Sequence, residues 1–358
     1  MVDVSDIVKK AVRTLKGKYG TASIGSSLPD KAEYVSTGNL AFDLISDGGI
    51  PFGYCIEFLG LSSSGKSTII YKVMANSQRD YDAICILADR ENAYNNPNGD
   101  RLGINNDNLI LANARDIPSP REGFQFILDS IESIRKHDKN IYIVVGLDSI
   151  AAFGKDVTFE KADAGRKAKI SHEGMREVIS RMDDKIMFMV ANQVTYKIGS
   201  YGDNRTSTAG ESMKYYSNLR FALQDAKKIV DSSAGNEVIG SWIGVEAIKT
   251  RLGPCYRTCY IKHLYETGID WYSGYARLLA NRGYLKPKNS KEYKAFNQVT
   301  LKYKDHELNE NNTEEWLKTY PELVFDKYPV YNMNESADEI EDESTELDNL
   351  NPSFDLEG

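Results

Sequence analysis

Eight residues from Gly60 to Ser67, with the sequence Gly-Leu-Ser-Ser-Ser-Gly-Lys-Ser, constrain the fold of this chain more than any other feature. They match the phosphate-loop pattern in full, between an apolar run at 55–59 and a helix-compatible stretch at 66–79. In that setting the backbone N–H groups of the loop and the helix N-terminus point at a phosphate. Lys66 supplies a positive charge, and Ser67 supplies a hydroxyl ligand for Mg²⁺. The predicted nucleotide-binding residues are Gly60, Leu61, Ser62, Ser63, Ser64, Gly65, Lys66, Ser67 and Thr68.

Between residues 34 and 192, apolar runs alternate with helical patterns, which is typical of a mostly parallel sheet covered by helices. Two further runs, at 243–250 and 256–264, are joined by a Leu-Gly-Pro turn and predict a strand pair. We therefore predict an α/β fold with the phosphate loop at the end of one strand. The expected strands are 55–59, 83–88, 109–112, 141–147 and 186–191, and the expected helices are 66–79 and 120–136.

Two acidic positions follow expected strands. Asp148 ends the apolar run 141–147, where a carboxylate can hold Mg²⁺ beside the phosphate loop. An Asp that only caps the next turn would look the same, but the phosphate loop favours the metal role. Asp89 and Glu91 follow the run 83–88, and an acid there can orient an attacking water. We choose Glu91 over Asp89, although a lone acid is more often solvated surface.

The net charge of -8 is concentrated near the end of the sequence. Residues 335–358 contain ten acidic side chains and no basic one, which leaves 44 basic and 42 acidic residues in 1–334. The body is thus nearly neutral, so a nucleic-acid-binding surface is not excluded. No apolar run is long enough to span a membrane and no basic-then-apolar leader is visible, so we expect a cytoplasmic protein with no membrane partner.

The chain divides into four expected parts. Residues 1–33 hold a short helix whose apolar stripe packs either on its own domain or on a neighbouring subunit. The core spans 34–274, a small C-terminal domain spans 275–331, and an acidic tail that cannot fold alone spans 332–358. Four cysteines form no disulfide framework in so long a chain, and no histidines pair with Cys255 and Cys259 at zinc spacing.

Several motifs together resemble the bacterial RecA family. The run 34–43 (Tyr-Val-Ser-Thr-Gly-Asn-Leu-Ala-Phe-Asp), the Gly-Gly-Ile-Pro turn at 48–51 and the phosphate loop agree with that family in order and spacing. The likeness covers roughly residues 5–275 and is highly specific. It continues through 89–100, 148–152, 191–193, 197–199, 210–220 and 249–269.

The resemblance implies roles for individual residues. Glu91 matches the family's water-activating glutamate, and Gln193 matches the glutamine that senses the γ-phosphate, although an ordinary polar strand end would look alike. Lys249 and Arg251 match two basic residues that reach across a subunit interface toward the neighbour's phosphates. Without the family they would be read as solvated strand charges. With Lys66, these four residues are the implied catalytic set.

Two loop-like segments, 155–169 and 195–210, correspond in the family to DNA-contacting loops. Their basic side chains can neutralise backbone phosphates, and their aromatic and apolar side chains can stack or wedge against bases. Taken alone, the same composition also suits plain mobile loops. The implied DNA-binding residues are Arg166, Lys167, Lys169, Tyr196, Lys197, Ile198, Tyr201 and Arg205.

The chain also departs from the family pattern. Asn95 and Asn98 stand where the family usually has an acid and an aromatic residue beside the adenine, which leaves Tyr265 as the candidate for stacking on the base. From about Tyr275 onward no motif matches the bacterial form. Such divergence suits a viral or otherwise distant member, for which the location would be the host cytoplasm.

The resemblance implies an ATP-dependent homologous recombinase with an RecA-type P-loop ATPase core. It would form a helical filament on single-stranded DNA with ATP and Mg²⁺, pair that strand with a homologous duplex and exchange strands, with DNA-stimulated ATP hydrolysis. A single-strand-binding protein or a loader are accessory partners that the sequence does not identify. A ring-forming helicase and a regulatory ATPase that binds proteins are the two alternatives, and the N-terminal helix disfavours the first.

Overall fold

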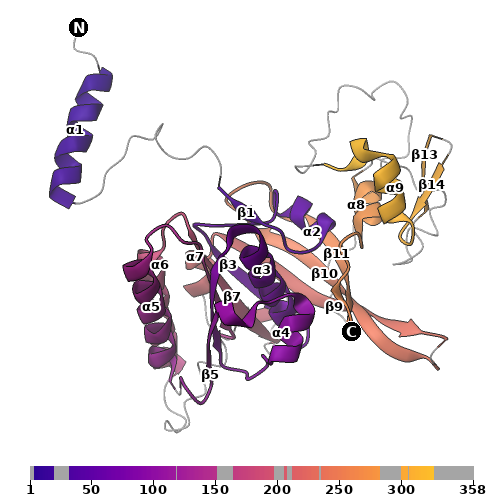
Figure 1. Cartoon of the computed structure of the whole chain (residues 1–358), viewed down its shortest axis with the longest axis horizontal. Helices are drawn as coiled ribbons and strands as arrows, with labels where there is room; N and C mark the ends of the chain where they lie inside the picture. Colours follow the sequence, from indigo (N-terminus) through magenta and orange to yellow (C-terminus); the bar gives the residue numbers. More distant parts are fainter. Residues whose placement is uncertain are drawn as a thin grey trace.

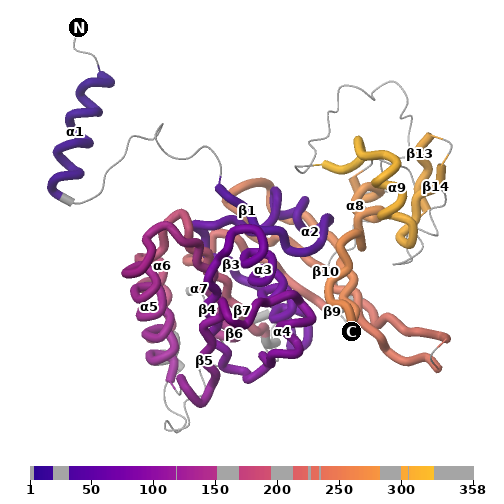
Figure 2. The backbone as a smooth tube through the Cα atoms, viewed as in Figure 1, coloured from indigo at the N-terminus to yellow at the C-terminus, as the bar shows by residue number. Residues whose placement is uncertain are grey.

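A computed structural model of the chain describes residues 4–19, 32–117, 119–150, 164–196, 205–207, 212–233, 235–282, 300–304 and 306–325. Its centre is a ten-stranded sheet with helices on both faces (Figure 1; the backbone path is traced in Figure 2). Along the sheet the strands follow the order β12-β11-β10-β9-β3-β7-β6-β4-β5, and β8 pairs with β7 outside that row. The sheet is mostly parallel, which confirms the predicted α/β class.

The parallel strands contain all five strands expected from the sequence. They are joined by β9, which the sequence analysis missed, and β9 runs parallel to β3. The bounds are β3 (Cys55–Gly60), β4 (Ile84–Asp89), β5 (Leu109–Asn113), β6 (Ile143–Asp148), β7 (Ile186–Tyr196) and β9 (Leu219–Asp231). Because the carboxyl ends of parallel strands lie at the same edge of a sheet, the segments that follow β3, β4, β6 and β7 all begin at that edge.

The antiparallel strands extend the sheet on one side. β10 (Glu237–Lys249) pairs with β9 and with β11 (Thr258–Leu264), and β12 (Gly268–Ile269) forms the edge. The strand pair predicted at 243–250 and 256–264 is therefore confirmed, although β10 begins earlier than expected. The β9–β10 ladder contains three register shifts, the last of them between Ala247 and Lys249.

Helices cover the two faces because side chains alternate along each strand. α3 (Lys66–Tyr81) shares an apolar cluster with the β3 residues Ile56 and Phe58, on the face that also carries α2 (Leu40–Ile45) and α4 (Asn96–Leu102). The opposite face carries α5 (Pro120–His137), α6 (Ala164–Arg181) and α7 (Ser212–Tyr216), whose cluster includes Cys55 and Val145. The helices expected at 66–79 and 120–136 are thus α3 and α5.

Two segments expected as loops contain regular structure. The segment 155–169 was predicted as a loop, but α6 begins within it, at Ala164. The helix is stabilised by packing on α5 through residues such as Met175 and Val178. Within 195–210, β7 extends to Tyr196 and β8 (Arg205–Ser207) pairs antiparallel with it, as the β-branched Thr content of both strands favours. Residues 155–163, 197–204 and 208–210 lie outside the described residues.

The two ends of the described chain differ in how they are covered. The predicted N-terminal helix is α1 (Val4–Tyr19), and its apolar positions Val4 and Ile7 are 71% and 52% exposed. By contrast, α8 (Tyr275–Asn281) contributes the fully buried Tyr275 to the core cluster of the sheet. β13 (Thr300–Tyr303), β14 (His306–Asn309) and α9 (Thr313–Thr319) complete this lobe, and the tail from 326 lies outside the described residues. The domain boundaries proposed from the sequence remain a prediction.

The remaining short elements frame the core. β1 (Tyr34–Val35) pairs antiparallel with β2 (Ile50–Pro51), and single 3₁₀ turns lie at Asn106–Asn108 and Pro321–Leu323. Among the helices that the structure describes, none is long and apolar enough to cross a membrane.

Candidate active site

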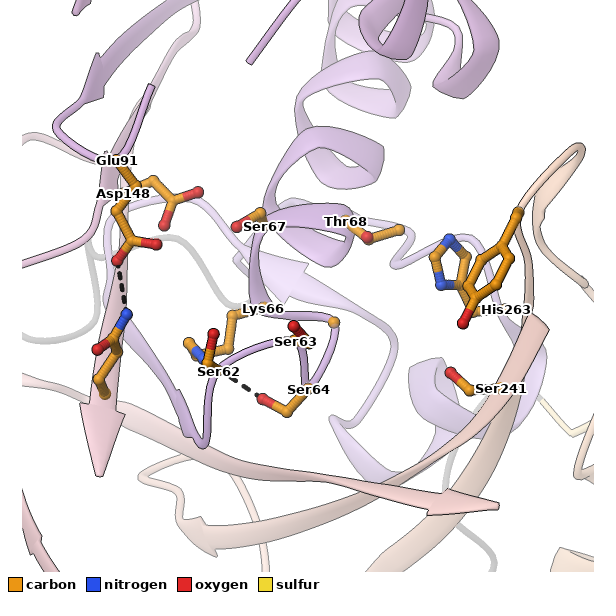
Figure 3. Close-up of a pocket in the computed structure, with 13 residues that line it drawn as sticks. Ser62, Ser63, Ser64, Lys66, Ser67, Thr68, Glu91, Asp148, Ser241 and His263 are labelled. Carbon is orange, nitrogen blue, oxygen red and sulfur yellow. Dashed lines mark hydrogen bonds between the residues drawn. The ribbon is translucent and has the colours of Figure 1, made fainter. Parts of the chain in front are cut away.

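A cavity of about 390 Å³ opens at the carboxyl edge of the parallel strands, around the phosphate loop. Figure 3 shows Glu91 and Asp148 on one side of the loop and Ser241 and His263 on the other. The cavity therefore joins residues as far apart in the sequence as Ser62 and Tyr265. Its described lining consists of Ser62, Ser63, Ser64, Gly65, Lys66, Ser67, Thr68, Glu91, Asp148, Gln193, Ser241, His263 and Tyr265.

The phosphate loop has the backbone that its glycines permit. Gly65 has φ +87° and is the N-cap of α3, a left-handed conformation that side chains other than glycine rarely adopt. A Cβ on Gly60 would lie 2.3 Å from the carbonyl oxygen of Leu223. Gly60 and Leu61 are not among the described residues that line the cavity, but their carbonyl groups accept hydrogen bonds from Lys66 Nζ at 3.1 and 2.6 Å.

Lys66 is buried, and this burial lowers the pKa of its ammonium group, against the influence of Asp148 and Glu91. Its ammonium group also donates to the Ser64 hydroxyl at 3.4 Å, so all its partners in the loop are neutral. A buried cation with neutral partners gains free energy when an anion comes within reach. The first turn of α3 supplies backbone N–H groups at the same place, because no side chain caps it. The loop thus has the features that a nucleotide phosphate requires.

Asp148 is 1% exposed at the end of β6, and burial raises its pKa to about 6. The Ser67 hydroxyl hydrogen-bonds to it, and the Tyr71 hydroxyl donates to its Oδ2 at 3.2 Å. A carboxylate and a hydroxyl are the oxygen ligands that Mg²⁺ prefers, and a cation would favour the charged form of this buried acid. Both side chains therefore fit the predicted ion. Tyr71 was not predicted from the sequence, although its place one turn after Ser67 on α3 was a usable signal.

Glu91 is oriented by two neighbours from different strand ends. Its Oε1 accepts a hydrogen bond from the Gln193 side-chain amide at 2.8 Å and another from the Ser149 hydroxyl. Asp89 is instead buried and accepts from the backbone N–H groups of Glu91 and Tyr94 at 3.0 and 2.8 Å. Asp89 thus shapes the turn, whereas Glu91 faces the cavity. Of the two acids, the one chosen from the sequence, Glu91, is therefore the one that lines the cavity.

The other end of the cavity is built by the antiparallel strands. Tyr265 lines it and is 48% exposed, with its ring 5.8 Å from that of His263, and burial lowers the pKa of His263. Asn95 instead caps α4 by accepting from the Asn98 N–H at 3.0 Å, and neither residue is among the described residues of the lining. Ser241 and His263 were not predicted from the sequence, because no local pattern marks their part in the cavity.

Lys249 and Arg251 lie at the opposite edge of the sheet from the cavity. Lys249 ends β10 eight residues after Ser241, which lines the cavity, and it pairs across strands with Arg220, the partner of Glu57 in the middle of β3. Its ammonium donates to the carbonyl oxygen of Lys214 at 2.6 Å. Burial, followed by the charges of Arg251 and Arg220, lowers the pKa of Lys249. The structure thus does not bring this pair together with the other predicted catalytic residues of the same chain.

The predicted DNA-binding residues lie, in the sequence, between the end of β6 and the end of β8. Lys169 is exposed on α6, with its ammonium 4.0 Å from Glu173. Arg166 and Lys167 belong to the first turns of α6, and Tyr196 pairs across strands with Arg205. Lys197, Ile198 and Tyr201 lie outside the described residues. The segments that bear these residues therefore begin at the same sheet edge as the cavity.

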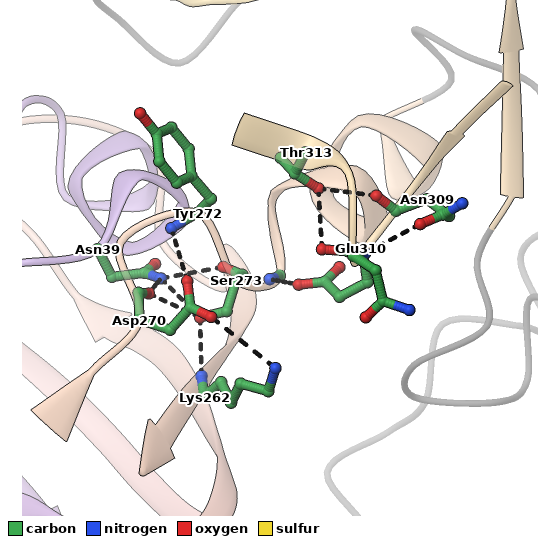
Figure 4. Close-up of polar contacts among 10 residues, drawn as sticks. Asn39, Lys262, Asp270, Tyr272, Ser273, Asn309, Glu310 and Thr313 are labelled. Atoms are coloured by element: carbon green, nitrogen blue, oxygen red, sulfur yellow. Dashed lines mark hydrogen bonds and ion pairs between the residues drawn. The ribbon is translucent and has the colours of Figure 1, made fainter. Parts of the chain in front are cut away.

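A separate polar cluster joins the C-terminal lobe to the sheet (Figure 4). The Gly274 N–H donates to Glu310 Oε1 at 2.5 Å, and the Asn39 amide donates to the Ser273 carbonyl oxygen at 2.9 Å. Burial raises the pKa of Glu310 to about 7, and nearby Asp270 adds to the effect. This carboxyl group is therefore partly protonated near neutral pH.

Comparison with known proteins gives one consistent result. The family model described as the RecA N-terminal domain matches residues 6–270. A protein named Protein RecA from Mesomycoplasma hyopneumoniae is 29% identical over 87% of this chain and 92% of its own length. Namesakes from Colwellia psychrerythraea and Thermotoga maritima are 28% and 26% identical, over 75% and 89% of this chain and 77% and 88% of their own lengths.

Proposed function

The chain belongs to the RecA family, and from that premise we propose that it is an ATP-dependent homologous recombinase. It would form filaments on single-stranded DNA, pair that strand with a homologous duplex and exchange strands while hydrolysing ATP. The observation that carries the proposal is the placement of Glu91 by Gln193 and Ser149 at the rim of a cavity that also holds Lys66 and Asp148. Such an arrangement suits hydrolysis of a phosphoanhydride, which needs positioned charge and an oriented water.

Each residue has a distinct part in the proposed hydrolysis. Lys66 would leave its carbonyl partners to neutralise the phosphates, and Ser67 and Asp148 would hold Mg²⁺. When bound, Mg²⁺ neutralises the charge that develops on the phosphate oxygens. Glu91 would orient the attacking water and take its proton, and Gln193 would bind the γ-phosphate. On loss of that phosphate, Gln193 would return to Glu91.

Self-assembly is supported by surfaces that the described part of a single subunit leaves uncovered. The apolar stripe of α1 is exposed, and so is Leu111 (40%) on β5, the strand at one edge of the sheet. An exposed edge strand can pair with another chain. Lys249 and Arg251 lie across the sheet from their own cavity, so they could complete only the site of a neighbour. We therefore propose an active site shared between adjacent subunits, in the manner of an arginine finger.

Coupling to DNA is supported by Gln193, which lies on β7 two positions before Thr195, where the second predicted DNA-binding segment begins. A shift of Gln193 toward or away from the γ-phosphate would be passed along β7 to that segment. The two predicted DNA-binding segments would then change together with the nucleotide state. We propose ATP, Mg²⁺, single-stranded DNA and a homologous duplex as the ligands and a second copy of the chain as the partner.

The experiment that tests the proposal measures ATP hydrolysis with and without single-stranded DNA and images the same mixtures by electron microscopy. We expect DNA to stimulate hydrolysis and filaments to form, with the Glu91→Gln variant as a control that binds DNA but hydrolyses ATP about 10²-fold more slowly. Rings instead of filaments would support a helicase. Hydrolysis that DNA leaves unchanged would support a regulatory ATPase.

A further inference from the structure

A charged residue lies inside the parallel sheet, where apolar side chains are the rule. Glu57 is fully buried in the middle of β3, between the apolar residues Ile56 and Phe58. Its two carboxylate oxygens bond to two different neighbouring strands. Oε1 accepts from the Asn192 side-chain amide of β7 at 2.6 Å, and Oε2 accepts from Arg220 of β9.

Stability alone does not account for this arrangement. A buried ion pair generally stabilises a fold no more than apolar side chains of similar size would, because desolvation offsets the attraction. Burial of such a group gives a specific geometry instead, since each hydrogen bond fixes the position of its partner. Here the fixed partners are one residue on β7 and one on β9.

The residue held on β7 immediately precedes Gln193. Asn192 and Gln193 point to opposite faces of the sheet because side chains alternate along a strand. On one face the amide of Asn192 is held by Glu57, and on the other the amide of Gln193 donates to Glu91 at 2.8 Å. Any rotation or slip of β7 at Asn192 would therefore displace Gln193 relative to the cavity.

We propose that Glu57 is a positioning residue for the nucleotide site, which holds Asn192 so that Gln193 can reach the γ-phosphate. Through its second oxygen the same carboxylate orients Arg220, the cross-strand neighbour of Lys249. One buried side chain would thus order groups toward both edges of the sheet. The inference rests on the proposed function, since the place of Gln193 matters only where a nucleoside triphosphate binds.

The test compares two variants with a matched control in the full-length chain. Glu57→Gln removes the charge, and Asn192→Leu removes the link to β7 while leaving Glu57 with Arg220. The control is Asp47→Asn, which breaks another ion pair of low exposure, Asp47 Oδ1 to Arg257 Nη1 at 2.5 Å, away from Gln193. All three would lower the melting temperature, so stability does not distinguish them.

The deciding measurement is the ratio of two dissociation constants with Mg²⁺ present, that for ADP divided by that for an ATP analogue with an imido group between its β- and γ-phosphorus atoms. We expect the ratio to fall at least about fivefold in Glu57→Gln and in Asn192→Leu and to remain unchanged in Asp47→Asn. In ATP hydrolysis, kcat should fall by a similar factor while KM is retained. A merely structural role would give Asp47→Asn the same losses.

Two results would overturn the inference. One is an unchanged ratio in Asn192→Leu, which decides the matter alone if Glu57→Gln does not fold. The other is a wild-type ratio near one, because Gln193 would then read no γ-phosphate. If the wild type prefers the analogue to ADP but hydrolyses no ATP, the proposed function is wrong. The inference on Glu57 is then still tested by the ratio of dissociation constants in the variants.

Discussion

The two edges of the parallel sheet differ in the charges that they gather. At the carboxyl edge the acids Glu91 and Asp148 lie beside the buried cation Lys66, around an open cavity. At the amino edge Lys249 is held by the carbonyl oxygen of Lys214 and lies near two further cations, Arg251 and Arg220. The first edge lacks an arginine among its described lining residues, and the second offers basic side chains. This difference is what the proposed shared active site requires. A subunit would bind its own nucleotide at the carboxyl edge and present basic side chains to a neighbour's nucleotide at the amino edge.

The largest effect should follow from removing the amino-edge pair. Without positive charge on the transferring phosphate, the variant Lys249→Ala, Arg251→Ala should lose about 10³-fold in kcat, as arginine fingers do. Mixing it with an inactive Lys66→Ala variant should restore some turnover, because each contributes the half that the other lacks. Steady-state ATP hydrolysis measures the recovery. If filaments that contain both variants hydrolyse no ATP, the proposed sharing of the active site between subunits is contradicted.

At the carboxyl edge, binding and chemistry should separate. Glu91→Gln should lower kcat about 10²-fold by removing the group that accepts the proton from water, while nucleotide binding is kept. Lys66→Ala should lose nucleotide binding itself, because no other cation lines the described phosphate loop. Titration with a fluorescent ATP analogue and single-turnover hydrolysis measure the two effects. Normal hydrolysis by Glu91→Gln would assign the water to another residue.

Glu310 lies apart from both edges and should affect stability without affecting catalysis. Its pKa of about 7 in the fold exceeds the ordinary value of 4.5, so the folded state binds more protons between those values. The stability that this group contributes is therefore present below pH 4.5 and is lost as the pH rises through 7. The groups around it are Asp270, Lys262 and Arg277.

Replacement by Gln removes this titration and keeps an oxygen for the Gly274 N–H. Glu310→Gln should therefore raise the free energy of unfolding at pH 8 by at most about 3 kcal/mol and have little effect at pH 4.5. Chemical denaturation at the two pH values measures this difference. An equal effect at both would show that Glu310 does not titrate in this range, and altered ATP hydrolysis would link the lobe to the cavity.

The smallest effect should come from the acidic tail, which lies outside the described residues. Its ten carboxylates can compete with DNA phosphates for a basic surface, at a local concentration set by the tether. Removing residues 335–358 should speed loading onto duplex DNA by about tenfold at low salt and leave ATP hydrolysis on saturating single-stranded DNA unchanged. Equal loading rates with and without the tail across a salt series would show that the tail does not compete with DNA and only increases solubility.

Short sequence patterns predicted most of the candidate-site residues at the carboxyl edge of the sheet. The glycines and Lys66 of the loop, the apolar run before Asp148 and the strand before Glu91 are each contained in a few consecutive residues. Ser241 and His263 could not be found in this way, because they reach the cavity only through the pairing of β10 with β9 and β11. Glu57 did leave a signal, an acid inside the apolar run Cys-Ile-Glu-Phe-Leu. Its meaning depended on Asn192 and Arg220, which only the sheet brings near.

Strand β10 carries both Ser241, in the lining of its own cavity, and Lys249, which we propose to serve the next subunit. Eight residues of extended chain span about 26 Å at a rise of about 3.3 Å per residue. In an assembly with shared sites, the length of this strand would set the distance between successive nucleotides. Deleting two residues from it would keep the alternation of side chains but shorten that distance, and the pitch of the filament would change as a result.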